Sequence, residues 1–253
     1  MMPEIKTERG TIWYADHRKN KTIQGDLILI HGAAGSHLAW PGQLRRLGAL
    51  ALDLPGHEKS PGTGRDDIKA YAADVLAFMD ALDIERAVLV GHSMGGAIVQ
   101  TIALDKPERV TGLVLIGTGA KLAVSPEILD NVKDRAEKVG SQLKDWMWAD
   151  ETPEAIRQMS FEQFLKIDPQ VIYGDYYACT QFDVRDRLSE ITTPTLVIGG
   201  SEDFMTPLKF SKYLAEHIAN AELVTIEGGG HMMALEKPQV VTDAITSWLE
   251  TQP

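Results

Sequence analysis

The stretch VLVGHSMGGAIVQ, residues 88–100, places one serine and three glycines between two apolar segments. The first segment is typical of a β-strand buried on both faces, and the second is typical of a helix. Between them, Gly91–Gly95 reads G-x-S-x-G, which forms a nucleophile elbow when a strand precedes it and a helix follows. Such a sharp turn strains the backbone of Ser93 and leaves no room for side chains two positions away. The stretch therefore predicts an α/β fold and a nucleophilic Ser93.

The same glycines fit phosphate-binding loops poorly. A G-x-x-x-x-G-K-[ST] loop requires a lysine, and none follows Gly95 or Gly96. A dinucleotide-binding fingerprint requires G-x-G-x-x-G after the first strand of its unit, and this spacing is absent.

Strand-like and helix-like segments alternate over the first half of the chain. Between Asp66 and Leu82 the apolar residues recur every three or four positions, which indicates one helical stripe. The alternation predicts a parallel sheet covered by helices on both faces. The strand-like segments are GTIWYADHR (10–18), DLILIHG (26–32), LGALALDLPG (47–56), RAVLVG (86–91) and VTGLVLIGTG (110–119).

The alternation of strand-like and helix-like segments stops after Gly119. Residues 120–190 contain helix-like segments, such as SPEILDNVKDRAEKVGSQL (125–143) and TPEAIRQMSFEQFLKI (152–167), and almost no strand-like runs. An unstructured loop of that length is improbable in a compact domain, so we expect a helical insertion. Strand and helix patterns then return in TPTLVIGG, TPLKFSKYLAEHI, AELVTIEGGG and KPQVVTDAITSWLE. We expect a core of residues 1–119 and 191–253 with a helical cap of residues 120–190.

A serine nucleophile needs a base, and that base needs an orienting acid. The usual chain order places both after the serine, where the histidines are His217 and His231. His217 lies in a charged helical segment, whereas His231 ends a glycine-rich loop after a strand, so we assign His231 as the base. Glu202 and Asp203 both follow a strand and remain open as the acid. Asp183 is a weaker alternative, because it belongs to the end of the insertion.

Two N–H groups should stabilise the oxyanion that forms during acyl transfer. Met94 N–H lies at the start of the helix after Ser93. In the loop HGAAGSHLAW, Ala33 N–H is the best candidate for the second donor, and we expect His31 to shape this loop. Trp40 either lines the acyl pocket or packs beneath the loop.

Composition and charge exclude several other classes of protein. The chain has 253 residues, 44% hydrophobic and 24% charged, and a formal net charge of −11, which argues against binding nucleic acid or anionic membranes. Its one cysteine, Cys179, excludes an internal disulfide and a thiolate metal cage. We expect no metal, no cofactor and no membrane span, and a cytoplasmic location. The oligomeric state is not predicted.

Five segments together carry a family resemblance: the strand ending in HG, then DLPGHEKS, GHSMGG, GGSEDFMTP and GGGHMMALEKP. In this order they resemble the α/β-hydrolase fold superfamily, in particular carboxylesterases and enol-lactonase-like serine hydrolases with a helical cap. The resemblance covers nearly the whole chain and implies a mostly parallel sheet of about eight strands, with the cap after strand six. It also implies Ser93 as nucleophile, Asp203 as acid, His231 as base, and the N–H groups of Ala33 and Met94 as the oxyanion hole.

One departure from the family pattern is Glu58. Residues 53–60 read DLPGHEKS, whereas many relatives have glycine at the position of Glu58, followed by any residue and then serine. That loop lies beside the site entrance in the fold, so we expect Glu58 to affect access or to be a solvated charge at the rim. The elbow serine excludes haloalkane dehalogenases and epoxide hydrolases, which use an aspartate nucleophile.

The resemblance implies a carboxylesterase that cleaves small-molecule esters of small to medium apolar acyl groups. Trp40, Trp146 and Trp148 are candidate substrate-binding residues, since aromatic residues from the cap should line an apolar cleft. A lactonase, a thioesterase or a C–C bond hydrolase would use the same residues and remains an alternative. A ligand-binding receptor is the least favoured reading.

Overall fold

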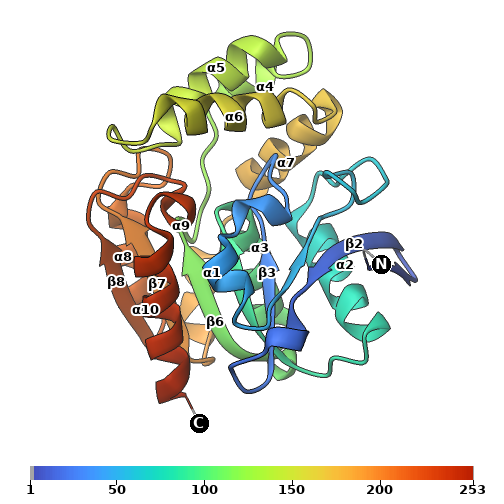
Figure 1. Ribbon diagram of the computed structural model, residues 1–253, viewed down its shortest axis with the longest axis vertical. Helices are drawn as coiled ribbons and strands as arrows, with labels where there is room; N and C mark the ends of the chain where they lie inside the picture. The colour runs from blue at the N-terminus through green and yellow to red at the C-terminus, as the bar shows by residue number, and fades with distance from the viewer. Residues whose placement is uncertain (1–2, 253) are drawn as a thin grey trace.

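The computed structural model describes residues 3–252 and is built on a sheet of eight strands in the order β1-β2-β4-β3-β5-β6-β7-β8 (Figure 1). The strands are β1 (Glu4–Thr7), β2 (Gly10–Asp16), β3 (Asp26–Ile30), β4 (Leu50–Leu52), β5 (Ala87–His92), β6 (Val110–Ile116), β7 (Thr195–Gly200) and β8 (Ala221–Ile226). The pairs β1–β2 and β2–β4 are antiparallel and the other pairs are parallel. The predicted α/β-hydrolase fold is confirmed. The short edge strand β1 was not predicted, because EIKT carries no buried apolar run.

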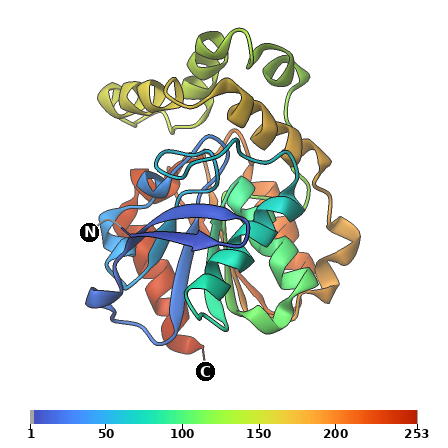
Figure 2. The same ribbon diagram turned by 90° about the vertical axis from the view of Figure 1, so that its right-hand side faces the viewer.

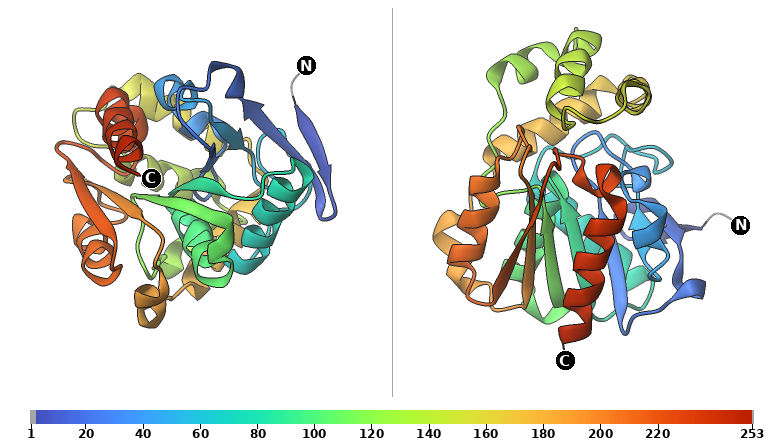
Figure 3. Two further views of the ribbon diagram at one scale, coloured as in Figure 1. Left: turned by 90° about the horizontal axis from the view of Figure 1, so that it is seen from below. Right: turned by 60° about the vertical axis from the view of Figure 1, so that its left-hand side comes forward.

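Two apolar clusters cover the two faces of the sheet. Side chains alternate along each strand, so Ile28 and Ile30 of β3 join one cluster while Leu27 and Leu29 join the other. Helices α2 (Ile68–Ala81), α3 (Met94–Asp105) and α8 (Leu208–His217) contribute to the first cluster. Helices α1 (Gly42–Arg45), α9 (Met233–Glu236) and α10 (Pro238–Thr251) contribute to the second. Seen from below, α10 lies on the opposite side of the sheet from α8 (Figure 3).

Four helices lie between β6 and β7 in the chain: α4 (Pro126–Asn131), α5 (Ala136–Trp146), α6 (Glu154–Phe164) and α7 (Pro169–Gln181). These inserted helices form a layer beyond the carboxyl ends of the strands (Figure 2). They share an apolar cluster that includes Val139, Leu143 and Phe164. The helix-like segment 125–143 divides into α4 and α5. The boundaries at 120 and 190 remain predictions.

The turn between β5 and α3 depends on close backbone contacts. Ser93 has φ 53° and ψ −117°, a conformation that costs an L-residue energy. A Cβ at Gly91 would overlap the carbonyl oxygen of Gly95, and a Cβ at Gly95 would overlap that of Ile30 in β3. The overlapped atoms belong to the backbone, so neighbouring side chains cannot relieve the clash by changing rotamer.

We therefore expect Gly95→Ala to lower the free energy of unfolding by at least about 3 kcal/mol, the upper part of the usual range for overpacking. Gly42→Ala is the matched control, because a Cβ there meets only the end of the flexible Arg46 side chain, at 3.0 Å. Denaturant unfolding of both variants checks this. Equal stabilities would show that the elbow tolerates a side chain at position 95.

Candidate active site

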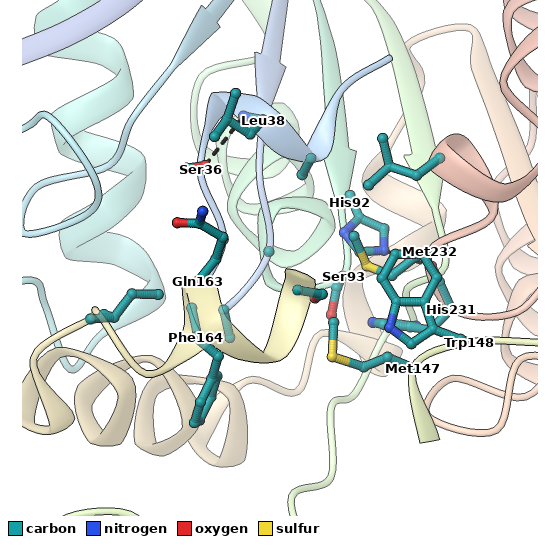
Figure 4. A pocket seen from close by; sticks show the side chains of 18 of the residues that line it. Ser36, Leu38, His92, Ser93, Met147, Trp148, Gln163, Phe164, His231 and Met232 are labelled. Atoms are coloured by element: carbon teal, nitrogen blue, oxygen red, sulfur yellow. Dashed lines mark hydrogen bonds between the residues drawn. The ribbon is translucent and has the colours of Figure 1, made fainter. Parts of the chain in front are cut away.

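Ser93 stands at the junction of β5 and α3, and the neighbouring strand β6 holds its backbone. Its N–H donates to the carbonyl oxygen of Ile116 at 3.0 Å, and Thr118 Oγ1 donates to the Ser93 carbonyl oxygen at 2.8 Å. The Ser93 side chain lies in a cavity together with His231 (Figure 4). The strained turn thus presents the hydroxyl to the cavity.

The loops after β7 and β8 bring Asp203 and His231 together. His231 Nδ1 lies 3.0 Å from Asp203 Oδ2 and 3.2 Å from Oδ1, and both side chains are buried. Thr206 also donates to this carboxylate, through its backbone N–H to Oδ1 at 2.8 Å and through its hydroxyl to Oδ2 at 2.7 Å. Burial alone would raise the pKa of Asp203, but His231 and the hydrogen bonds from His231 and Thr206 lower it overall. Asp203 is therefore an ionised partner for His231, whereas Glu202 is exposed.

His92, the residue before Ser93, supports His231 and was missed by the sequence analysis. Its Nε2 lies 2.9 Å from the His231 carbonyl oxygen, so Nε2 carries the proton and donates. Burial, and next the proximity of His231, lower the pKa of His92 to about 3, so it is neutral. Thr206 was missed as well. His92 occupies a variable position of G-x-S-x-G, and Thr206 lies within the loop after β7. No local sequence pattern predicts the contacts that these two side chains make.

Two backbone N–H groups are available beside the cavity. Among residues 3–252, neither Ala33 N–H nor Met94 N–H donates to another residue. In contrast, Ala34 N–H donates to Asp175 Oδ2 at 2.8 Å, and Gly35 N–H donates to the Gly32 carbonyl oxygen at 3.1 Å. Free donors therefore occur at the two residues that the sequence analysis selected.

His31 holds the loop that carries Ala33. Its Nδ1 donates to the Gly32 carbonyl oxygen at 2.8 Å, and its Nε2 accepts from Leu54 N–H at 3.0 Å. Burial lowers the pKa of His31 to about 4, so this neutral tautomer persists at pH 7.

The cavity has a volume of about 480 Å³ and is mainly apolar. Ser93 and His231 both line it. Within the described residues its lining contains no lysine or arginine and one carboxylate, Glu58, whose φ is 43°. The inserted helices and their connections contribute Met147, Trp148, Ile156, Met159, Phe164 and Ile167.

The three tryptophans predicted to bind substrate lie in different places. Trp148 lines the cavity. Trp146 does not, and its ring packs 5.7 Å from that of Phe204. Trp40 also does not line the cavity, since it is 1% exposed and packs in the core beneath the loop, edge-on to His92 at 6.4 Å. Burial in the apolar core is the more favourable position for so large a ring.

The part of the chain that the structure describes holds no group of three or more His, Cys, Asp or Glu residues arranged to bind a metal. Cys179 is buried, and burial raises the pKa of its thiol. No helix within residues 3–252 is both long and apolar enough to cross a membrane.

Fold and site together define a hydrolase, and comparison with known proteins agrees. The model of the alpha/beta hydrolase family matches residues 27–244, so the chain belongs to this family. It is 30% identical over 251 residues to RutD of Pseudomonas syringae pv. syringae (strain B728a), whose name describes a carbamate hydrolase, with 90% of this chain and 94% of that one covered.

Two further similarities concern other hydrolases. The chain is 29% identical to the 2-hydroxy-6-oxo-6-phenylhexa-2,4-dienoate hydrolase of Comamonas testosteroni, over 86% of this chain and 85% of that one. A thermophilic esterase of known structure superposes with a TM-score of 0.87 and 32% identity, over 98% of this chain and 96% of that one. The likeness therefore extends over most of the chain, and the names of these relatives describe several hydrolytic reactions.

The neutral His92 predicts a loss of stability in acid. The unfolded chain gains a proton at this histidine below about pH 6.5, but the folded protein does not until about pH 3. The contribution of His92 to stability is therefore complete above pH 6.5 and is lost as the pH falls, by about 3 kcal/mol at pH 4.

We expect His92→Gln to lack this part of the acid loss, since glutamine cannot titrate and its amide N–H can still donate to the His231 carbonyl oxygen. Denaturant unfolding of both proteins at pH 7 and pH 4 checks this. An identical loss in the two proteins would mean that His92 is not the neutral, buried group described above.

Proposed function

We propose that this hydrolase is a carboxylesterase that uses Ser93 as nucleophile, His231 as base and Asp203 as the orienting acid. The observation that carries the proposal is that Ser93, His231 and Ala33 line one apolar cavity. Asp203 contacts His231 from outside the cavity, and the N–H groups of Ala33 and of Met94, the residue after Ser93, are unpaired among the described residues. An acyl-transfer reaction requires each of these groups.

In the first half of the reaction, His231 Nε2 takes the proton of Ser93 as Oγ attacks the ester carbonyl carbon. The new C–O bond pushes an electron pair onto the carbonyl oxygen, which the N–H groups of Ala33 and Met94 stabilise. The C–O bond to the alcohol then breaks, and His231 returns its proton to the departing oxygen. Asp203 holds the imidazole in the required tautomer and stabilises its charged form.

In the second half, water replaces the alcohol. His231 takes a proton from water as its oxygen attacks the acyl carbon, and collapse of the second tetrahedral intermediate breaks the bond to Ser93. The proton returns to Ser93 Oγ, which leaves the carboxylic acid as product and the enzyme as it began.

The cavity favours neutral, apolar acyl groups. Its lining offers thioether, aliphatic and aromatic surface from residues such as Met147, Met159 and Phe164. A carboxylate on the substrate would find no lysine or arginine among the described lining residues and would face Glu58. This argues against anionic dienoates and carboxylated lactones.

A second candidate is a neutral carbamate ester, favoured by the likeness to the carbamate hydrolase. Its carbonyl carbon would undergo the same attack by Ser93. Neutral lactones and thioesters would react with the same groups of the site. Which of these substrates the enzyme prefers would depend on which of them fits the cavity.

The function is tested with neutral p-nitrophenyl esters of increasing acyl length and a fluorophosphonate that labels reactive serines. We expect turnover of the neutral esters and stoichiometric labelling at Ser93. Ser93→Ala should lose the labelling and lower kcat by at least about 10³-fold.

Matched substrates extend the same experiment: a neutral carbamate, and an ester whose acyl chain ends in a carboxylate. The carboxylated ester should have the lowest kcat/KM. Labelling of another residue, or preference for the charged ester, would contradict the assignment.

Asp203 and its neighbour Glu202 provide a second test. We expect Asp203→Asn to lower kcat by roughly 10⁴-fold, because an amide favours the wrong tautomer of His231. Glu202→Gln, one residue away on the exposed surface, should change kcat less than twofold. Steady-state kinetics on one neutral ester separates the two, and the reverse result would move the acid to Glu202.

A further inference from the structure

Asp175 of α7 is a fully buried carboxylate outside the proposed catalytic residues. Three groups from the sheet domain donate to it. Ala34 N–H and His57 Nε2 each donate to Oδ2 at 2.8 Å, and Tyr71 Oη donates to Oδ1 at 2.5 Å. The acceptor comes from the inserted helices, and the donors come from the loops after β3 and β4 and from α2.

His57 carries a positive charge in this cluster. Its Nε2 faces the Asp175 carboxylate, and its Nδ1 faces the Pro55 carbonyl oxygen at 3.1 Å. Neither partner can donate, so both ring nitrogens must hold protons, which makes the ring an imidazolium. Burial by itself lowers the pKa of His57, but the charge and hydrogen bond of Asp175 and the bond to Pro55 raise it overall. The buried carboxylate and imidazolium therefore compensate each other.

The cluster connects directly to the loop that carries a proposed oxyanion donor. Ala34 has φ 51°, a conformation unfavourable for alanine, so contacts must hold it there. One contact is its hydrogen bond to Asp175, and another is the bond from Gly35 N–H to the Gly32 carbonyl oxygen at 3.1 Å. Ala33, the preceding residue, lines the cavity with its N–H unpaired among the described residues. The Gly32 carbonyl and Ala33 N–H belong to one planar peptide unit. A change in Ala34 that moved Gly35 N–H away from the Gly32 carbonyl oxygen would therefore release the orientation of Ala33 N–H.

We propose that Asp175 is a positioning residue for acyl transfer: through Ala34 it fixes the direction of Ala33 N–H, so that correct seating of the inserted helices completes the oxyanion hole. This inference rests on the proposed function. According to this inference, α7 affects the rate of the reaction, whereas the inserted helices as a group also line the cavity.

A purely structural role for Asp175 makes a different prediction. Loss of the carboxylate would then reduce the amount of folded protein and leave the folded fraction with normal kcat. A positioning role affects kcat in the folded protein and leaves KM nearly unchanged, because the oxyanion forms only after substrate has bound.

The test is Asp175→Asn, whose amide N–H₂ would face a donor in the cluster. We expect kcat for a neutral ester to fall about 10- to 100-fold, as small misplacements of catalytic groups do, with KM within about threefold. The rate of labelling by the fluorophosphonate should fall in parallel, because its phosphoryl oxygen uses the same hole. Kinetics are normalised to folded protein measured by circular dichroism.

Asp168→Ala is the matched control. Asp168 is exposed and caps the start of the same helix by accepting from Gln170 N–H at 2.8 Å, so its loss weakens α7 without touching the Ala34 loop. We expect kcat and the labelling rate to stay within twofold of wild type. If Asp175→Asn does not fold, Tyr71→Phe removes one donor while the His57–Asp175 charges stay paired, and kcat should fall at least threefold.

The outcomes distinguish the two proposals. Normal kcat and labelling in folded Asp175→Asn, or in Tyr71→Phe if that variant replaces it, overturn the positioning role while the esterase proposal stands. An equal loss of kcat in Asp168→Ala overturns it too, since weakening α7 would then suffice. A wild-type protein that neither turns over esters nor reacts with the fluorophosphonate overturns both proposals.

Discussion

The backbone of Gly95 packs directly against the carbonyl oxygen of Ile30, and the rest of the site is arranged around this contact. It brings the start of α3 against the end of β3, so that Ser93 lies beside the loop of Ala33. Parallel strands end at the same edge of the sheet, and the loops after β7 and β8 therefore deliver Asp203 and His231 to that edge. A side chain at position 95 would separate the two halves of the proposed catalytic machinery.

The buried histidines differ in charge because their hydrogen-bond partners differ. His31 faces one carbonyl oxygen and one N–H, so it is neutral with a defined tautomer. His57 faces a carbonyl oxygen and a carboxylate and is positive. His92 donates to the backbone of His231 and is neutral. Each ring is buried, so its protonation state is set by fixed dipoles and charges, and the loops around Ser93 are held without reliance on bulk water.

The inserted helices and the segment joining α5 to α6 contact both sides of the site through carboxylates. Glu236 Oε1 accepts from Ala149 N–H at 2.6 Å, and its Oε2 accepts from Gly230 N–H, next to His231, at 2.7 Å. Asp175 makes the corresponding connection to the Ala34 loop. The segment that supplies Trp148 and Phe164 to the cavity is thereby fastened to the loop of His231 and to the loop of Ala33 and Ala34. In the proposed reaction, the same inserted segment would therefore line the substrate cavity and hold the loops that carry the reacting groups.

The sequence by itself determined every strand of the sheet except β1, the elbow at Ser93 and the helical character of residues 120–190, because these depend on local periodicity and on where glycine is needed. The same patterns selected His231 as the proposed base. It left the acid open between Glu202 and Asp203 until a family resemblance was considered. Tertiary structure alone decided that Trp40 packs in the core, that His92 and Thr206 support the His231–Asp203 pair, and that His57 and Asp175 form a buried charge pair. Ala34 and Asp175 are 141 residues apart in the chain, and no local pattern encodes which donor such a carboxylate will meet. That pairing exists only once the inserted helices have packed onto the sheet.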